Sequence, residues 1–187
     1  MTGSSPTLVW IDLELTGLDD PTDRILEVAV AVTGPVPAAD VPVREFVIWQ
    51  PESVLERMSP VVRRMHTRNG LIDRVRRSFL STADVEAELL RILADACPPR
   101  RAVLAGNSVW VDRRFLAVHM SAVERFLHYR QVDVSSLKVL AGAWFGERAR
   151  FEKDDSHTAA GDVRASIAEL LFYRSLFGVT DPPSPPP

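Results

Sequence analysis

Two acidic side chains stand one residue apart where an apolar segment ends. Asp12 and Glu14 follow the run Leu-Val-Trp-Ile, which is typical of a buried strand. Alternate residues of a strand point to the same face, so both carboxylates project from one side of the predicted sheet. Such a pair repels unless a cation lies between the two groups, and hard oxygen ligands suit Mg²⁺ or Mn²⁺. The spacing also fits a strand-end cap or salt bridge, so the metal hypothesis depends on further residues.

Three more residues could complete such a site. Asp112 lies four residues after Ser108, on the same face of a predicted helix and one turn from its start. The alternative is an exposed aspartate followed by two arginines. His157 precedes the last predicted helix, and Asp162 falls in its first turn. A histidine there can cap the helix or lie in solvent, but its free pKa of about 6.5 also suits proton transfer from water near neutral pH.

The elements that must position these residues change along the chain from β-rich to helical. Strands are predicted over 8–12, 25–32, 43–49, 102–106 and 132–134, and helices over 85–96, 121–128, 159–177 and from about Ser135. Asn107 and Ser108 are predicted to cap the helix that carries Asp112. Three antiparallel strands followed by strand and helix in alternation indicate a mixed sheet flanked by helices, in the α/β class.

Composition places the chain among folded, non-membrane proteins. Its 187 residues fit one domain, and 46 % apolar with 25 % charged residues is ordinary globular composition. We expect a flexible segment over 1–6, one domain over 7–178 and a disordered proline-rich tail over 179–187. The single Cys97 and the lack of a signal-like start favour the cytoplasm. No apolar run approaches the roughly 20 residues of a membrane span.

The charge pattern bears on nucleic-acid binding. Proteins that bind extended nucleic-acid duplexes usually carry an excess of basic residues, so the formal net charge of −3 argues against binding of this kind. Arginines gather between 63 and 77, where a solvated helix face is favoured over a binding surface.

Five ordered stretches together resemble the oligoribonuclease family, in the histidine-marked branch of the DEDD exonuclease superfamily. They cover residues 10–19, 65–71, 105–115, 127–138 and 157–163 and so extend over nearly the whole chain. The resemblance implies an RNase H-like fold and a homodimer. It also implies removal of nucleoside monophosphates from the 3′ end of very short single-stranded RNA, with dinucleotides, above all 5′-phosphorylated ones, as the favoured substrate.

The resemblance further implies a role for each acidic residue. Asp12, Glu14 and Asp162 would hold one metal ion, Asp12 would bridge to a second, and Asp112 would support that second ion. Two divalent cations, Mg²⁺ or Mn²⁺, would then clamp the scissile phosphate. His157 would take the proton from the attacking water.

A second group of residues, at positions that match the family pattern, fits substrate binding. Ser135 and Lys138 are three residues apart at a predicted helix start, where one face can offer a hydroxyl, an ammonium and backbone N–H groups to an anion. The resemblance implies that Leu18 wedges against the bases with His66 near it, that Ser108, Ser135, Lys138 and Arg130 receive the 5′ phosphate, and that Tyr129 reaches into the partner subunit's site.

One departure from the family pattern concerns base stacking. Val61 stands where the family usually places an aromatic residue, and stacking on a base contributes roughly 1–3 kcal/mol. Trp49, Met58 or Met65 could compensate. Two other functions share parts of the pattern: a DNA proofreading or repair exonuclease with the same five catalytic residues, and a nuclease-like binding module without activity. The group around Ser135 and Lys138 favours short RNA over the first, and the complete carboxylate set argues against the second.

Overall fold

The computed structural model describes residues 6–38, 40–152 and 158–179. Within these ranges the strands form one mixed sheet in the order β3-β2-β1-β4-β5. The first three pair antiparallel, and β4 and β5 run parallel to β1. The strands are β1 (Thr7–Leu15), β2 (Ile25–Thr33), β3 (Arg44–Val47), β4 (Ala102–Gly106) and β5 (Gln131–Asp133). The mixed α/β sheet predicted from the sequence is confirmed.

Helices form where the apolar spacing changes to three and four. In α4 the Ser81 hydroxyl accepts a hydrogen bond from Asp84 N while the Asp84 carboxylate accepts one from Ser81 N, so both ends of this capping box are satisfied. The helices are α1 (Glu52–Leu55), α2 (Pro60–Arg68), α3 (Leu71–Arg77), α4 (Thr82–Ala96), α5 (Trp110–His119), α6 (Ser121–Phe126), α7 (Val134–Phe145), the short η1 (Gly146–Ala149) and α8 (Ala159–Leu176). None of these described helices is both long and apolar enough to cross a membrane.

Several elements differ from their predicted bounds by a few residues, and for two of them the hydrogen bonds give the reason. β3 ends two residues before the predicted position because Trp49 donates its N–H to Leu80 O at 2.8 Å, outside the ladder with β2. The helix that carries Asp112 begins at Trp110 and has no side-chain cap. Ser108 instead adopts a left-handed φ of 50°, and only its backbone carbonyl contacts the helix start, where it accepts a hydrogen bond from Val111 N at 3.0 Å. The predicted capping role of Asn107 and Ser108 is therefore wrong.

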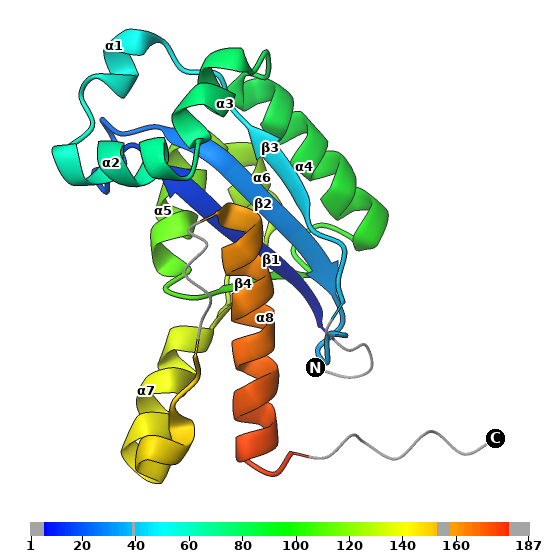
Figure 1. Ribbon diagram of the computed structural model, residues 1–187. Coiled ribbons are helices and arrows are strands. Elements are labelled where there is room, and N and C mark those ends of the chain that lie inside the picture. The colour runs from blue at the N-terminus through cyan, green and yellow to red at the C-terminus, as the bar shows by residue number, and fades with distance from the viewer. Residues whose placement is uncertain (1–5, 39, 153–157, 180–187) are drawn as a thin grey trace.

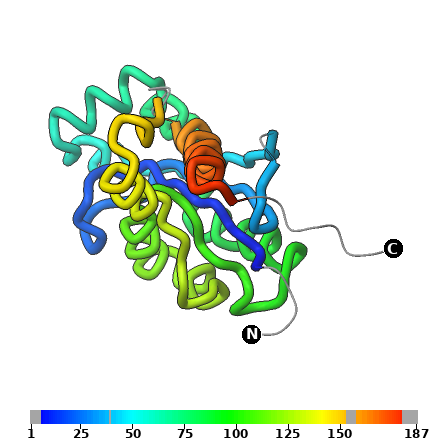
Figure 2. The backbone as a smooth tube through the Cα atoms, turned by 90° about the horizontal axis from the view of Figure 1, so that it is seen from below, coloured from blue at the N-terminus to red at the C-terminus, as the bar shows by residue number. Residues whose placement is uncertain are grey.

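Helices cover both faces of the sheet (Figure 1). α8 crosses one face with α7 beside it, and α4, α5 and α6 lie against the other, an arrangement that Figure 2 shows from below. Each face of the sheet has its own hydrophobic core, and β1 contributes to both. Val9, Ile11 and Leu13 pack with α4 to α6, while Leu8 and Trp10 pack with α8. Because side chains alternate along a strand, the acidic residues that continue the second series face α8.

A buried ion pair ties α3 to the sheet. Glu27 lies inside β2 and is fully buried, and its carboxylate pairs with Arg74 of α3. Glu27 also stands directly opposite Glu14 in the β1–β2 ladder. Since a buried charge without a counter-ion is strongly destabilising, Arg74 stabilises both the helix position and the strand next to the acidic residues.

Replacing Arg74 by methionine is expected to lower the free energy of unfolding by about 3 kcal/mol, because Glu27 then stays buried without its counter-ion. Arg76→Met is the matched control, since Arg76 lies on the same helix and pairs with Glu52 at the surface, where ion pairs contribute little. Urea unfolding measures both. Equal losses in the two variants would contradict a structural role for the buried pair, and adding Glu27→Gln to Arg74→Met should restore part of the loss.

Candidate active site

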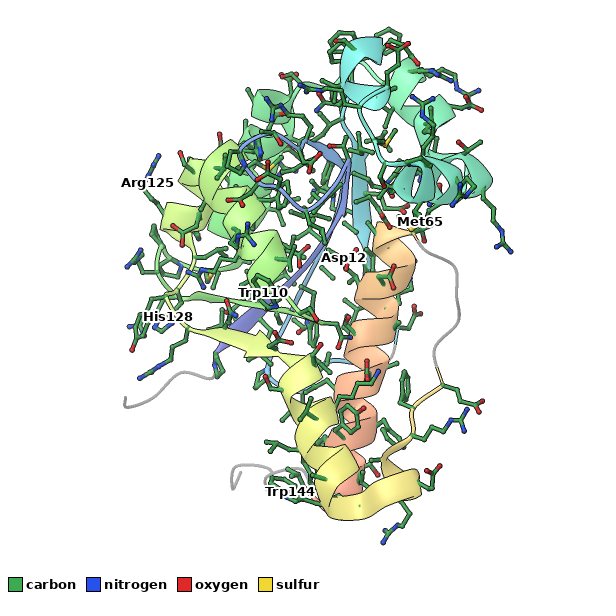
Figure 3. The ribbon with its side chains drawn as sticks, turned by 90° about the vertical axis from the view of Figure 1, so that its left-hand side faces the viewer. Asp12, Met65, Trp110, Arg125, His128 and Trp144 are labelled. Carbon is green, nitrogen blue, oxygen red and sulfur yellow. The ribbon has the colours of Figure 1, made fainter. Side chains whose placement is uncertain are left out.

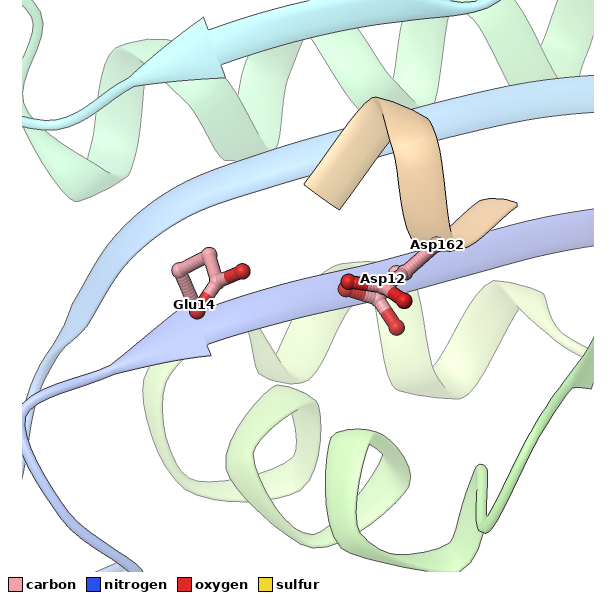
Figure 4. A group of neighbouring side chains, drawn as sticks. All are labelled: Asp12, Glu14 and Asp162. Carbon is pink, nitrogen blue, oxygen red and sulfur yellow. The ribbon is translucent and has the colours of Figure 1, made fainter. Parts of the chain in front are cut away.

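An acidic cluster lies on the α8 face of β1. Asp12 and Glu14 come from β1 and Asp162 from the first turn of α8, and one carboxylate oxygen from each lies within 4.8 Å of the others (Figure 4). Thr158 fixes the start of α8, because its hydroxyl accepts a hydrogen bond from Gly161 N at 3.2 Å and its carbonyl accepts one from Asp162 N at 2.9 Å. The fold thus brings together carboxylates from opposite ends of the chain.

The electrostatics of this cluster favour a cation. Burial, with the nearby charges of Asp162 and Glu27, raises the pKa of Glu14 to about 8, although the Arg74 guanidinium acts to lower it. A divalent cation among the three carboxylates would offset the same repulsion. The donor set consists of oxygen atoms only, which fits Mg²⁺ or Mn²⁺. By geometry and by ligand chemistry, the cluster is a candidate metal centre.

Asp112 adjoins the cluster from the first turn of α5. It is buried, and its Oδ1 accepts a hydrogen bond from the N–H of Leu13, the residue between the two acidic side chains of β1, at 2.9 Å. That N–H is available because β4 pairs with β1 only as far as Trp10. Burial raises the pKa of Asp112 to about 7. The alternative of an exposed aspartate does not hold.

His157, the predicted base, lies outside the described residues, so its role stays a prediction. In the sequence it directly precedes Thr158, the N-cap residue of α8.

The loop after β1 carries Leu18 at the surface, with 72 % of the residue exposed. Asp23 shapes this loop, since its carboxylate accepts hydrogen bonds from the Thr16 hydroxyl at 2.8 Å and from Asp19 N at 2.9 Å. Gly17 is required here because a Cβ would lie 2.3 Å from Asp23 Oδ2. The loop is thus tied down while its apolar tip faces solvent, which suits the predicted wedge without testing it.

His66 lies beneath this loop and is fully buried. Its Nε2 donates to Leu15 O at 2.9 Å, and its Nδ1 lies 3.9 Å from Glu14 Oε2. Burial lowers the pKa of His66, which favours the neutral ring. His66 thus contacts the end of β1 and a member of the acidic cluster, and any contact with substrate stays a prediction.

A second polar cluster joins the end of β4 to the start of α7. Asp133 Oδ1 accepts hydrogen bonds from the N–H groups of both Ser108 and Ser135, each at 2.9 Å. Ser135 Oγ also accepts from Ser108 N at 2.9 Å, and the two serine hydroxyls lie 3.2 Å apart. Lys138 follows on α7, with 57 % of its side chain exposed. The structure therefore brings together Ser108 and Ser135 and places Lys138 three residues further along the same helix, which accounts for three of the four predicted phosphate-binding residues.

Sequence reasoning missed the residues behind this second cluster. Asn107 Oδ1 accepts a hydrogen bond from the Ser135 hydroxyl at 3.1 Å, and Asn107 Nδ2 donates to Glu169 Oε2 at 3.0 Å. Glu169 is fully buried on α8. A signal was present: Glu169 shares a helix face with Asp162, seven residues earlier, and a carboxylate on the inward face of a helix needs polar partners.

Tyr129 and Arg130 form a separate surface pair just before β5. The Arg130 guanidinium carbon lies 5.0 Å from the centroid of the Tyr129 ring, and Tyr129 is 64 % exposed. Arg130 also lines a cavity of about 610 Å³ together with Arg101 and His128. Exposed tyrosine and arginine are typical of protein interfaces. The predicted contact of Tyr129 with a partner subunit's site, and that of Arg130 with the 5′ phosphate, both stay predictions.

The position that lacks an aromatic residue is open to solvent. Val61 lies on α2 and is 67 % exposed. Met58 is buried and cannot replace an aromatic side chain there, whereas Trp49 is half exposed. Met65 is partly buried, so Trp49 is the one aromatic side chain among the three possible substitutes.

Comparison with known sequences shows which proteins the chain resembles. The family model described as Exonuclease, of the RNase T type, matches residues 9–170. The chain is 44 % identical over 177 residues to the oligoribonuclease of Thiobacillus denitrificans, a match that covers 92 % of this chain and 96 % of that protein. It is 41 % identical over 171 residues to the oligoribonuclease of Francisella tularensis, with 91 % and 96 % covered.

Solved structures with a similar fold are exonuclease I proteins. The zinc-bound complex of Escherichia coli exonuclease I with single-stranded DNA matches with a TM-score of 0.70 at 16 % identity, over 94 % of this chain and 42 % of that one. Exonuclease I of Methylocaldum szegediense matches with a TM-score of 0.63 at 18 % identity, over 92 % and 43 %. The chain thus spans less than half of these larger proteins. At such identities the likeness shows the fold alone, and the predicted RNase H-like fold is confirmed.

Proposed function

The chain belongs to the oligoribonuclease family of exonucleases, and on this premise we propose that it is a metal-dependent 3′-to-5′ exoribonuclease that degrades short oligoribonucleotides to nucleoside monophosphates. The observation that carries the proposal is the meeting of Asp12, Glu14 and Asp162, with oxygens within 4.8 Å of one another, in a chain 41 to 44 % identical to oligoribonucleases. A time course on a 5′-phosphorylated RNA ladder, with and without EDTA and beside a single-stranded DNA oligomer, tests polarity, metal need and sugar preference together.

The chain's own residues divide the chemical work. Asp12, Glu14 and Asp162 would hold one divalent cation, with Asp12 shared with a second ion that Asp112 supports. When bound, Mg²⁺ or Mn²⁺ supplies charge stabilisation at the scissile phosphate and lowers the pKa of water. His157 accepts the proton of the attacking water. The hydrogen bond from Leu13 N to Asp112 Oδ1 ties α5 to the strand that carries Asp12 and Glu14.

The second polar cluster is suited to binding the 5′ phosphate of a dinucleotide whose scissile phosphate lies at the acidic cluster. Ser108 and Ser135 offer two hydroxyls 3.2 Å apart, and Lys138 adds an ammonium on the same helix. The Ser108 hydroxyl and the Lys138 ammonium can donate charge-assisted hydrogen bonds to a terminal phosphate. The Ser135 hydroxyl gives its proton to Asn107 Oδ1 and accepts the Ser108 N–H, so it holds Ser108 in place. We name Ser108, Ser135 and Lys138 the phosphate cap. The exposed Leu18 would meet the bases between the cap and the acidic cluster.

Dinucleotides with a 5′ phosphate are expected to be hydrolysed with the highest kcat/KM, because longer chains forgo the contact between cap and terminal phosphate. A hydrogen bond to a charged group contributes roughly 1.5–3 kcal/mol, so removing the phosphate or lengthening the chain should lower kcat/KM by about tenfold or more. The measurement compares RNA of two, three and seven nucleotides in the wild type and in Lys138→Ala. Equal values across lengths in the wild type would refute the cap, and an unchanged preference in the variant would remove Lys138 from it.

We propose further that the active enzyme is a homodimer in which Tyr129 and Arg130 of one subunit complete the site of the other. The support for this proposal is that Tyr129 is 64 % exposed beside Arg130, and that exposed tyrosine and arginine are typical of protein interfaces. Tyr129→Ala is expected to lower kcat/KM while leaving the acidic cluster intact, and dilution to monomer should abolish activity. Light scattering with an activity assay on the same samples measures both. A fully active monomer would contradict the shared site.

A further inference from the structure

Glu169 occupies an unusual place for a carboxylate. It lies in the middle of α8 with no exposed surface, on the helix face that also carries Asp162, Ser166 and Tyr173. Tyr173 donates its hydroxyl to Glu169 Oε1 at 3.0 Å. A buried carboxylate is tolerated only when charged or hydrogen-bonding partners surround it. Two further partners connect Glu169 to the phosphate cap: Lys138 is itself a cap residue, and Asn107 is hydrogen-bonded to the cap residue Ser135.

The first partner is Asn107, at the end of β4. Glu169 Oε2 accepts from Asn107 Nδ2 at 3.0 Å, and Ser166 Oγ accepts from the same Nδ2 at 2.8 Å. Because a carboxylate only accepts, it fixes which end of the Asn107 amide faces α8. The amide oxygen must then face away, where it accepts the Ser135 hydroxyl at 3.1 Å. Glu169 thereby sets the orientation of a cap serine that it does not touch.

The second partner is Lys138 of the cap. Its Nζ lies 3.7 Å from Glu169 Oε1, although more than half of the lysine side chain is exposed. An exposed lysine otherwise samples many rotamers, so a buried carboxylate within ion-pair distance restricts where the ammonium lies. In Figure 3 α7 lies beside α8, and the N-terminal end of α8 lies beside Asp12.

We propose that Glu169 is a positioning residue for 5′-phosphate recognition, and that it orients Ser135 through Asn107 and Lys138 directly. The inference rests on the proposed function, because it assigns Glu169 to the phosphate cap of that site. α8 then serves both ends of the substrate: its first turn supplies Asp162 to the acidic cluster, and two turns later Glu169 holds the cap. Displacement of this helix would disturb both ends together.

Glu169→Gln tests the proposal, because the amide keeps the size of the side chain but cannot accept at both ends or attract the ammonium. The experiment measures kcat and KM for one diribonucleotide with and without its 5′ phosphate. In the wild type we expect a phosphate preference in kcat/KM of about tenfold or more. In Glu169→Gln the preference should fall to within about twofold of its value in Lys138→Ala, through KM of the phosphorylated substrate, while kcat changes little.

Tyr173→Phe is the matched control. It removes a different hydrogen bond from the same carboxylate without touching Asn107 or Lys138, so its phosphate preference should equal that of the wild type. Thermal unfolding of each variant shows whether it folds. Should Glu169→Gln fail to fold, Asn107→Ala gives the same test, because it breaks the link from Glu169 to Ser135.

The outcomes separate this inference from the proposed function. A preference that falls in Lys138→Ala but stays at the wild-type value in Glu169→Gln would overturn the role of Glu169 and leave the exonuclease and its cap standing. An equal fall in Tyr173→Phe would reduce Glu169 to a general structural role and overturn the inference as well. A wild type that hydrolyses dinucleotides without phosphate preference would refute the cap, and with it the role of Glu169, but not the nuclease.

Discussion

Replacing Asp12 by alanine is expected to lower kcat on a diribonucleotide by about a thousandfold or more, the largest effect of any single carboxylate change. Asp12 lies between Glu14 and Asp162 in the acidic cluster, and in the proposed mechanism it is the ligand that both cations share. Loss of several kcal/mol of charge stabilisation at the phosphate corresponds to such a factor, since each 1.36 kcal/mol is tenfold. EDTA should abolish hydrolysis in the wild type, and Mn²⁺ or Mg²⁺ should restore it.

Asp95→Asn is the control for this change, because Asp95 is a surface carboxylate of α4 paired with Arg91, and its kcat should match that of the wild type. Full activity in EDTA would contradict the metal mechanism. An Asp12→Ala enzyme with at least a tenth of the wild-type rate would show that Asp12 is not the shared ligand.

Metal affinity offers a second measurement that does not depend on turnover. The pKa of Glu14 is raised to about 8 and that of Asp112 to about 7 in the metal-free protein, so protons occupy these groups at lower pH. A cation binds the deprotonated carboxylate and must displace those protons. Affinity for Mn²⁺, measured by titration calorimetry, should therefore fall as pH falls from about 8 to 6. Glu14→Gln should weaken binding and flatten this dependence.

The positions of the clustered carboxylates along their elements were predictable because strand and helix periodicity are local properties. Asp12 and Glu14 end an apolar strand, and this alone places both on one face. Asp162 follows a helix start whose cap, Thr158, can be read from the sequence. The meeting of the two segments at one point, however, depends on how α8 crosses the sheet. Residue spacing carries no information on that crossing, and only the family resemblance predicted it.

The partners of buried charges could not be predicted in the same way. Glu27 and Glu169 are recognisable in the sequence as carboxylates among apolar residues, yet their partners Arg74 and Asn107 come from segments far away in the chain. Asn107 shows the difficulty directly. Its local sequence indicated a helix cap, but hydrogen bonds to α7 and α8 replaced that role. Local side-chain preference was overridden by tertiary contacts.

Replacing His157 by alanine is expected to lower kcat by about a hundredfold to ten-thousandfold, the usual contribution of general-base catalysis. In the proposed mechanism His157 takes the proton of the attacking water from its place before Thr158. Substrate binding measured in Ca²⁺ should change little, because the acidic cluster and the phosphate cap stay intact. His119→Ala is the matched control, since His119 lies on α5 and its Nε2 donates a hydrogen bond to Asp20 O at 2.8 Å.

The pH dependence of kcat tests whether the activity lost in His157→Ala reflects the loss of a general base. A histidine base works only when neutral, so wild-type kcat should rise with pH through a midpoint near its ordinary value of about 6.5 and then level off. Protonation of Glu14 and Asp112 would weaken metal binding over an overlapping range, so the profile must be taken at saturating Mn²⁺, where those ligands stay deprotonated. In His157→Ala the step near 6.5 should vanish while the His119→Ala profile keeps it. A step that persists in His157→Ala would assign the proton transfer to another group and leave His157 no part in the chemistry.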